Sequence, residues 1–168
     1  MLLARGGRKR GRKNSPPVNR VRPHDNGGIS TSQEMTKTGE IVIGNKESDY
    51  VVLEITGLEP GGEWASANIE VHCDGWAGTM KGSFRKDELA RFAQEVRRLH
   101  RDLTGVAQLD PTEPNIVLTL TGDGKGHVTV DGVARNNLTS GSRLTFRFTI
   151  DQTYLEGIAD SLNDADEV

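Results

Sequence analysis

The chain has 168 residues and a formal net charge of −3, a length that suits one domain with a terminal segment. Cys73 is the only cysteine, which excludes an intrachain disulfide and any zinc site that needs two cysteines of one chain. The sequence contains no apolar run of about 18 residues, so it predicts no membrane-spanning helix, and the lone cysteine favours a reducing cytosol.

Charge is distributed unevenly along the chain. The first 23 residues carry eight Lys or Arg and no acid, whereas the remainder carries 13 basic and 24 acidic residues. Residues 1–38 also contain few large apolar side chains after Leu3. Such a segment buries too little apolar surface to offset its ordering entropy. We therefore predict a basic, disordered tail over 1–38, one acidic domain over 39–164 and a short acidic end at 165–168.

The domain opens with stretches in which apolar and polar residues alternate. "DYVVLEITG" places Val51, Leu53 and Ile55 on one face, and "WASANIEVHCD" does the same for Ile69 and Val71. "WAGTMKGSF" continues the pattern with Trp76, Met80 and Phe84 on one side. A period of two is typical of half-buried antiparallel strands.

The period then changes to that of a helix in "DELARFAQEVRRLHRDLTG". Apolar residues recur at helical spacing, acidic residues suit the first turn, and Gly105 suits the position after the last turn. The apolar stripe comprises Leu89, Phe92, Val96, Leu99 and Leu103, and the acids are Asp87 and Glu88. The pattern predicts one helix of about 17 residues.

Strands return after "DPTEPN", in "IVLTL", in "HVTV" beyond the "GDGKG" hairpin, and in "SRLTFRFTID". Asp151 then suits the N-cap of a closing helix in "DQTYLEGIADSL". The predicted order is βββ-α-βββ-α, to which "EIVIG" could add a strand. We expect an α+β fold: a curved antiparallel sheet of about six strands with both helices packed on its apolar face. The alternative is a sheet curled into a half-barrel around the first helix.

The motifs that look reactive have structural explanations. In "HCD", strand neighbours point to opposite faces, so Cys73 is separated from His72 and Asp74 and is expected to be buried. "GDGKGH" has no following helix and lacks the spacing of a phosphate-binding loop. His24, His100 and His127 include no pair spaced as metal ligands on one element. We therefore predict no catalytic residue, no cofactor and no metal, and we expect no enzyme.

Carboxylates gather on the predicted outward face of the first strands. Glu54, Glu70 and Asp74 share this parity, and Trp64 falls on it as well. One interpretation is an ordinary solvated face with a tryptophan at its edge. The other is a binding surface, because an aromatic anchor within an acidic field suits a basic protein partner. Both interpretations remain open at this point.

Several stretches together resemble the WapI-type immunity proteins, small bacterial cytosolic proteins that neutralise a cognate polymorphic toxin. They are "MKGSFRKDELARFAQEVRRL", "IVLTLTGDGKGHVTVDG" and "LTFRFTIDQTYLEGIADSL", and the resemblance covers about residues 41 to 163. The ending "DQTYLEGI", just after a strand, carries most weight, followed by Phe84, Glu88, Leu89 and Phe92. The resemblance implies a non-enzymatic protein whose partner is a toxin domain, and it brings no catalytic residue with it.

The basic tail has no counterpart in that family and allows three interpretations. Residues 5–22 could contact nucleic acid non-specifically, since Lys and Arg bind phosphates but no aromatic residue is present for base stacking. They could form a nuclear or surface-binding signal. Alternatively, the functional chain begins near Met35, which we favour because the domain looks complete without the tail.

We therefore expect a cytosolic immunity protein that binds a toxin stoichiometrically, with the toxin basic and plausibly a nuclease. The competing hypothesis is a nucleic-acid-associated protein that acts through its basic tail. The identity of the gene immediately upstream discriminates between them. A large toxin with a variable C-terminal domain favours immunity.

Overall fold

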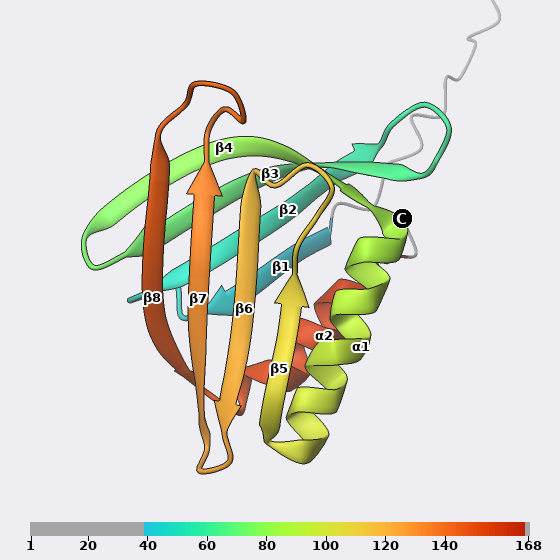
Figure 1. Ribbon diagram of the computed structural model, residues 1–168. Coiled ribbons are helices and arrows are strands. Elements are labelled where there is room, and N and C mark those ends of the chain that lie inside the picture. The colour runs from blue at the N-terminus through green and yellow to red at the C-terminus, as the bar shows by residue number, and fades with distance from the viewer. Residues whose placement is uncertain (1–38, 167–168) are drawn as a thin grey trace, which may run out of the picture. The chain divides into compact units, whose positions relative to one another are not determined.

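A computed structural model describes residues 39–166, so every sequence-based prediction about the tail over 1–38 lies outside the described residues (Figure 1). Within that range the chain forms eight strands and two helices. They fall into two halves, each an antiparallel four-stranded meander followed by a helix. The first half comprises β1 (Gly39–Gly44), β2 (Tyr50–Leu58), β3 (Trp64–Cys73), β4 (Trp76–Arg85) and α1 (Lys86–Asp102). The second half comprises β5 (Thr104–Leu109), β6 (Ile116–Asp123), β7 (His127–Arg135), β8 (Arg143–Asp151) and α2 (Tyr154–Asp166).

The first four strands form sheet A, in the order β1-β2-β3-β4, and all its pairs are antiparallel. The β3–β4 connection fixes the register of the outermost strand. Cys73 pairs with Trp76, and the two residues between them, Asp74 and Gly75, both have positive φ (51° and 78°). Asp-Gly is a preferred sequence for a two-residue turn of this type, whose twist matches that of the strands. The pairing then continues without a bulge to Trp64 and Arg85.

The last four strands form sheet B, in the order β5-β6-β7-β8, again antiparallel throughout. At the β6–β7 turn, the Asp123 carboxylate accepts hydrogen bonds from the backbone N–H groups of Lys125 (2.7 Å) and His127 (3.1 Å). These bonds hold the carboxylate in its charged form and lower the pKa of Asp123. The glycine-rich segment is therefore a hairpin turn, as its sequence predicts.

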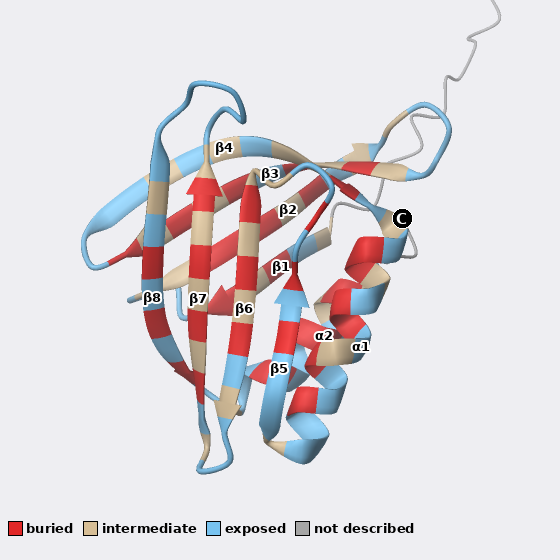
Figure 2. Ribbon diagram, in the orientation of Figure 1, coloured by how far each residue is buried: buried red, intermediate tan, exposed pale blue. Residues whose placement is uncertain are grey.

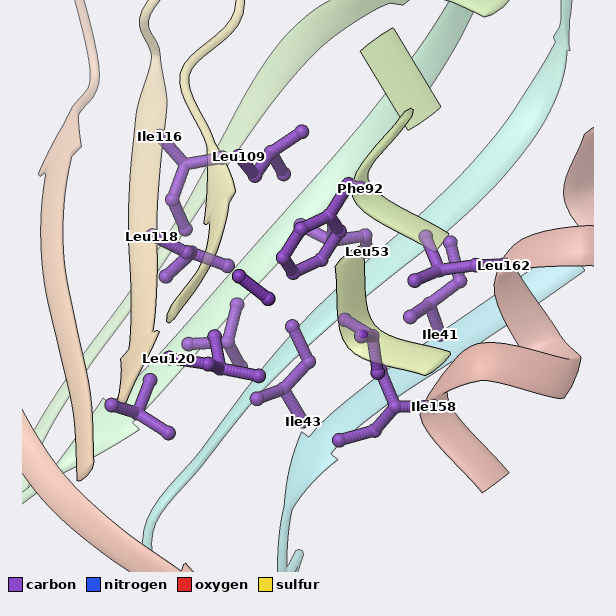
Figure 3. Close-up of a cluster of buried hydrophobic side chains, with 14 of the residues drawn as sticks. Ile41, Ile43, Leu53, Phe92, Leu109, Ile116, Leu118, Leu120, Ile158 and Leu162 are labelled. Atoms are coloured by element: carbon purple, nitrogen blue, oxygen red, sulfur yellow. The ribbon is translucent and has the colours of Figure 1, made fainter. Parts of the chain in front are cut away.

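The two sheets pack against each other, and the helices close one side of the sandwich. Helix α2 packs on β1, helix α1 packs on β5, and the two helices pack on each other (Figure 1). Burial alternates along the strands of both sheets (Figure 2). One continuous core results, in which Ile43 and Leu53 of sheet A meet Leu118 of sheet B and Phe92 of α1 (Figure 3).

The prediction of one sheet of about six strands, with both helices on its apolar face, is wrong in detail, although the α+β class is confirmed. There are two four-stranded sheets, and their apolar faces share one core with the buried residues of both helices. Alternation reports which residues are buried but not which element covers them. The prediction also lacked β5, because only Ala107 and Leu109 of its six residues are buried, which leaves too little pattern to recognise.

Helix α1 has the predicted length of 17 residues and the predicted apolar stripe. Its end differs from the expectation, because Leu103 rather than Gly105 adopts the left-handed conformation (φ 59°) that terminates the helix. Gly105 already belongs to β5. The Leu103 N–H bonds to the carbonyl of Leu99 (2.8 Å), so the helix turns directly into the next strand.

Cys73 lies inside the sandwich, as expected for a structural cysteine, and it is 3% exposed. Its Sγ donates to the backbone carbonyl of Arg147 in β8 (3.6 Å). Burial, and then the negative charges of Asp49 and Asp74, raise the pKa of the thiol, so the reactive thiolate is disfavoured at neutral pH.

We predict that Cys73 reacts slowly with a thiol reagent in the native protein and rapidly in urea. Cys73→Ser should lower the free energy of unfolding by about 1–3 kcal/mol, because it leaves a more polar group in an apolar site. Absorbance during labelling and urea titration measure the two effects. Labelling of the native protein as fast as that of the unfolded protein would contradict the prediction.

Candidate functional site

Sheet A presents a polar face away from the core, which we call the outer face. It is formed by the residues that alternate with the buried ones, and strand pairing sets them side by side. A hollow of about 560 Å³ crosses this face. The hollow is lined by Glu40, Val52, Glu54, Asn68, Ile69, Glu70, Thr79, Met80 and Lys81. Three of these residues are glutamates and one is a lysine. The hollow therefore gathers more acidic than basic side chains.

Two glutamates of the hollow are held in fixed orientations by neighbouring side chains. Glu54 accepts a hydrogen bond from the Asn68 amide through one carboxylate oxygen (3.0 Å), and Glu70 accepts one from the Tyr50 hydroxyl (2.6 Å). Within the described residues, no bond is found to the second oxygen of either carboxylate. Each therefore keeps an acceptor for a partner's cation, and its orientation is set before binding.

Tyr50 and His72 extend the outer face beyond Glu70. Their rings stack with centroids 5.4 Å apart and planes 8° apart, and the two residues are opposite each other on β2 and β3. The Nδ1 of His72 donates to the carbonyl of Ser48 (2.7 Å), which fixes the ring. The hydrogen bond to Glu70, followed by burial, raises the pKa of Tyr50, so its hydroxyl keeps its proton at neutral pH.

The four residues selected from sequence are only partly brought together. Glu54 and Glu70 line the same hollow. Trp64 lies at the far end of β3, opposite Arg85, about 13 Å along the strand from Asn68. Asp74 occupies the turn at the other end, where its N–H donates to the Asp49 carboxylate (3.0 Å). The alternation of residues along each strand indicates one side of the sheet for these residues. The length of β3, however, separates Trp64 and Asp74 from the hollow.

Acidic residues outnumber basic ones in the strands and turns of sheet A. Residues 39–85 contain eight acidic and three basic residues, whereas helix α1 contains four acidic and five basic residues. One base of the first group, Lys46, is paired with Glu40, and both side chains are about half exposed. The outer face of sheet A is therefore an acidic surface, which attracts basic partners and repels polyanions.

Sequence reasoning missed Glu40, Tyr50 and Lys81 as members of the site. Glu40 and Lys81 join it through pairing with Glu54 and Asn68, which no single strand reveals. Tyr50 precedes the recognised alternation by one residue, and its hydrogen bond to Glu70 spans two strands. The sequence signal that could have identified Tyr50 was alternation along the strand. Tyr50, Val52 and Glu54 follow each other at intervals of two residues, so they face the same side of the sheet.

Residues 39–166 offer neither a cluster of metal-binding side chains nor a helix able to cross a membrane. This part of the chain contains no group of three or more His, Cys, Asp or Glu side chains placed to hold a metal ion. Neither of its helices is long and apolar enough to cross a membrane.

Comparison with known proteins decides the family. The model of the immunity protein WapI-like family matches residues 42–166, which is most of the chain. The chain belongs to this family. The match confirms the resemblance inferred from the sequence and includes all the residues of the hollow except Glu40.

Two further comparisons add little to the family assignment. No curated protein matches the chain significantly. A solved structure titled "Crystal structures of trypanosoma bruciei MRP1/MRP2" aligns over 79% of this chain and 84% of that chain, with 10% sequence identity and a TM-score of 0.44. A similarity of this strength supports no conclusion about this member of the WapI-like family.

Proposed function

We propose that this protein is an immunity protein that neutralises a cognate toxin by stoichiometric binding in the cytosol. Membership of the WapI-like family is the observation that carries the proposal. Neutralisation by binding requires a preformed surface rather than reactive groups. The acidic outer face of sheet A supplies such a surface, because Glu54 and Glu70 are already held by Asn68 and Tyr50.

The toxin surface that fits this face is basic. The hollow carries three glutamates and one lysine, so a partner's Lys or Arg side chains would find acceptors in place. Such side chains gather where an enzyme binds phosphates, so a nuclease is the toxin class that we favour. Occupying that cleft would prevent its substrate from entering. Long-range attraction would mainly raise the association rate and select the partner.

If the gene immediately upstream encodes a toxin, its C-terminal domain is the partner with which the proposal is tested. We expect that co-expression of the full chain restores growth of cells that produce the toxin domain. The purified proteins should form a complex with a 1:1 ratio by calorimetry and light scattering, and the complex should lack toxin activity. Growth arrest despite expression of the folded protein, together with no complex at micromolar concentrations, would overturn the proposal.

A further inference from the structure

The outermost strands of the two sheets differ in how they are covered. Strand β1 has α2 beside it and strand β5 has α1 beside it, whereas no helix of the described chain lies along β4 or β8 (Figure 1). Natural proteins usually protect such edges with short strands, proline or bulges, because exposed edges invite pairing with another chain. Strand β4 has ten residues, no proline and no bulge in its pairing with β3.

The register shows which backbone groups of β4 are free. Cys73 and Trp76 flank a two-residue turn and form a hydrogen-bonded pair, so every second residue of β4 from Trp76 bonds to β3. The intervening residues Ala77, Thr79, Lys81 and Ser83 direct their N–H and C=O groups away from the sheet. Within residues 39–166, no other hydrogen bond is found to these backbone groups. These outward N–H and C=O groups form a row of unpaired backbone hydrogen-bonding groups along the strand, which we call the unpaired ladder of β4.

An apolar groove lies beside the first part of this ladder. It has a volume of about 290 Å³ and is lined by Val71, Trp76, Ala77, Gly78, Thr79, Met80, Ala134, Asn136, Ser142, Arg143 and Leu144. Met80 and Leu144 are partly buried against the core, so the groove opens directly onto it. Trp76 is 68% exposed, an unusual position for a large aromatic side chain on the core-facing side of a strand.

The other uncovered edge, β8, is less suitable for an added strand. The carbonyl of Arg147 already accepts the Cys73 thiol (3.6 Å). The outward face of β8 also carries Arg143 and Arg147, and the second of these is paired with Asp131 on β7 (2.6 Å). The β4 edge instead adjoins the acidic outer face, because Thr79 pairs with Glu70. The side chains beside β8 are therefore basic, whereas the face beside β4 is acidic.

We propose that the edge of β4 accepts an extended segment of the toxin as a fifth strand of sheet A, an inference that rests on the proposed function. Side chains of an added strand alternate between two faces. One set would enter the apolar groove beside Trp76, Met80 and Leu144. The other set would lie on the outer face, where a Lys or Arg opposite Thr79 would span two strand spacings, about 10 Å, to reach Glu70. The recognised segment therefore alternates apolar with polar residues and carries a basic residue at that position.

Charge selects a basic segment over a second copy of this chain. Pairing of two β4 edges would place two acidic outer faces side by side. Like charges placed together in this way oppose association. An extended basic segment meets the acidic outer face with opposite charge, and its backbone would complete the unpaired ladder.

The edge is tested on the full chain with a ten-residue peptide that alternates valine and lysine. Thr79→Pro removes one outward N–H and leaves the bonds of β4 to β3 intact, whereas the matched control Thr79→Val keeps the N–H. We expect Thr79→Pro to weaken peptide binding by about five- to tenfold and Thr79→Val to change it less than about twofold. Trp76→Ala should also weaken binding, because it removes one wall of the groove. Fluorescence anisotropy measures the affinities, and thermal melting confirms that the variants fold.

Two further peptides test whether the backbone is recognised. N-methylation of all the lysines or of all the valines removes the N–H groups from one side of the extended peptide. Only one side can face β4, so one of these peptides should lose binding and the other should keep it. Equal binding of both peptides, or of Thr79→Pro and the original protein, would overturn the proposal. A dimer that Thr79→Pro dissociates would also overturn it, because a second copy would then occupy the edge.

The toxin domain separates this proposal from the proposed function. If Thr79→Pro binds and neutralises the toxin as well as the original protein does, the edge proposal fails and the immunity function stands. If the original protein does not bind the toxin, the proposed function fails whatever the peptides show. Loss of toxin binding in Thr79→Pro, with binding kept in Thr79→Val, supports both.

Discussion

Replacing Glu88 with alanine is expected to lower the free energy of unfolding by about 3 kcal/mol. Glu88 is the only buried charged residue identified between residues 39 and 166, with 5% exposure. One carboxylate oxygen accepts the Arg85 N–H at the start of α1 (2.9 Å), and the other accepts the N–H and the hydroxyl of Thr112 (both 2.7 Å). The substitution leaves two backbone donors without their partner. Urea titration followed by circular dichroism measures the loss.

Two variants separate this network from simple charge effects at the helix start. Asp87→Ala removes the neighbouring, exposed carboxylate of the same first turn and should cost less than about 1 kcal/mol. Glu88→Gln preserves the shape but offers one carbonyl oxygen in place of two carboxylate oxygens, so an intermediate loss is expected. Equal effects of Glu88→Ala and Asp87→Ala would contradict the account. The carboxylate ties α1 to the loop between β5 and β6, so the effect should reach both sheets.

Local elements were predictable from the sequence because their patterns are strong. Helix α1 shows five buried apolar residues at helical spacing, and β3 alternates over its whole length. The division into two sheets was not predictable in the same way. Sheet A ends where α1 begins, and the chain must cross the sandwich before β5 can start sheet B. A period of two is the same whether a helix or another sheet covers the apolar face.

The candidate site shows the same division between local and non-local information. Parity alone placed Glu54 and Glu70 on one face, and pairing of Glu54 with Asn68 then brings them to a common hollow. The Tyr50–Glu70 hydrogen bond depends on the register between β2 and β3, which the sequence does not specify by itself. The free ladder of β4 likewise follows from the turn at Asp74 and Gly75 together with the absence of a covering helix within the described chain.

Reversing the charge of two of the three glutamates in the hollow, with Glu54→Lys and Glu70→Lys, should slow association with a basic toxin domain by about 10- to 100-fold. The two changes replace oriented acceptors with cations at the centre of the outer face. Asp131→Lys is the matched control, because it makes the same change of charge per site on the outward face of sheet B, which points away from the hollow. Stopped-flow kinetics at low salt measures the association rates. If Asp131→Lys slows association as much as Glu54→Lys alone or Glu70→Lys alone, only the net charge of the protein matters and the hollow has no special role.

Salt dependence and dissociation distinguish steering from direct contact. Exposed charges more than about 8–10 Å apart are screened near physiological salt, so the rate differences among these proteins should shrink as salt is added. Trp64→Ala and Asp74→Lys probe the two ends of β3, beyond the hollow. If the toxin covers the full outer face, loss of the Trp64 ring should mainly speed dissociation, whereas Asp74→Lys should slow association. If both variants bind as the original protein does, the contact is confined to the hollow around Glu54 and Glu70, because the strand places these ends about 13 Å or more from its centre.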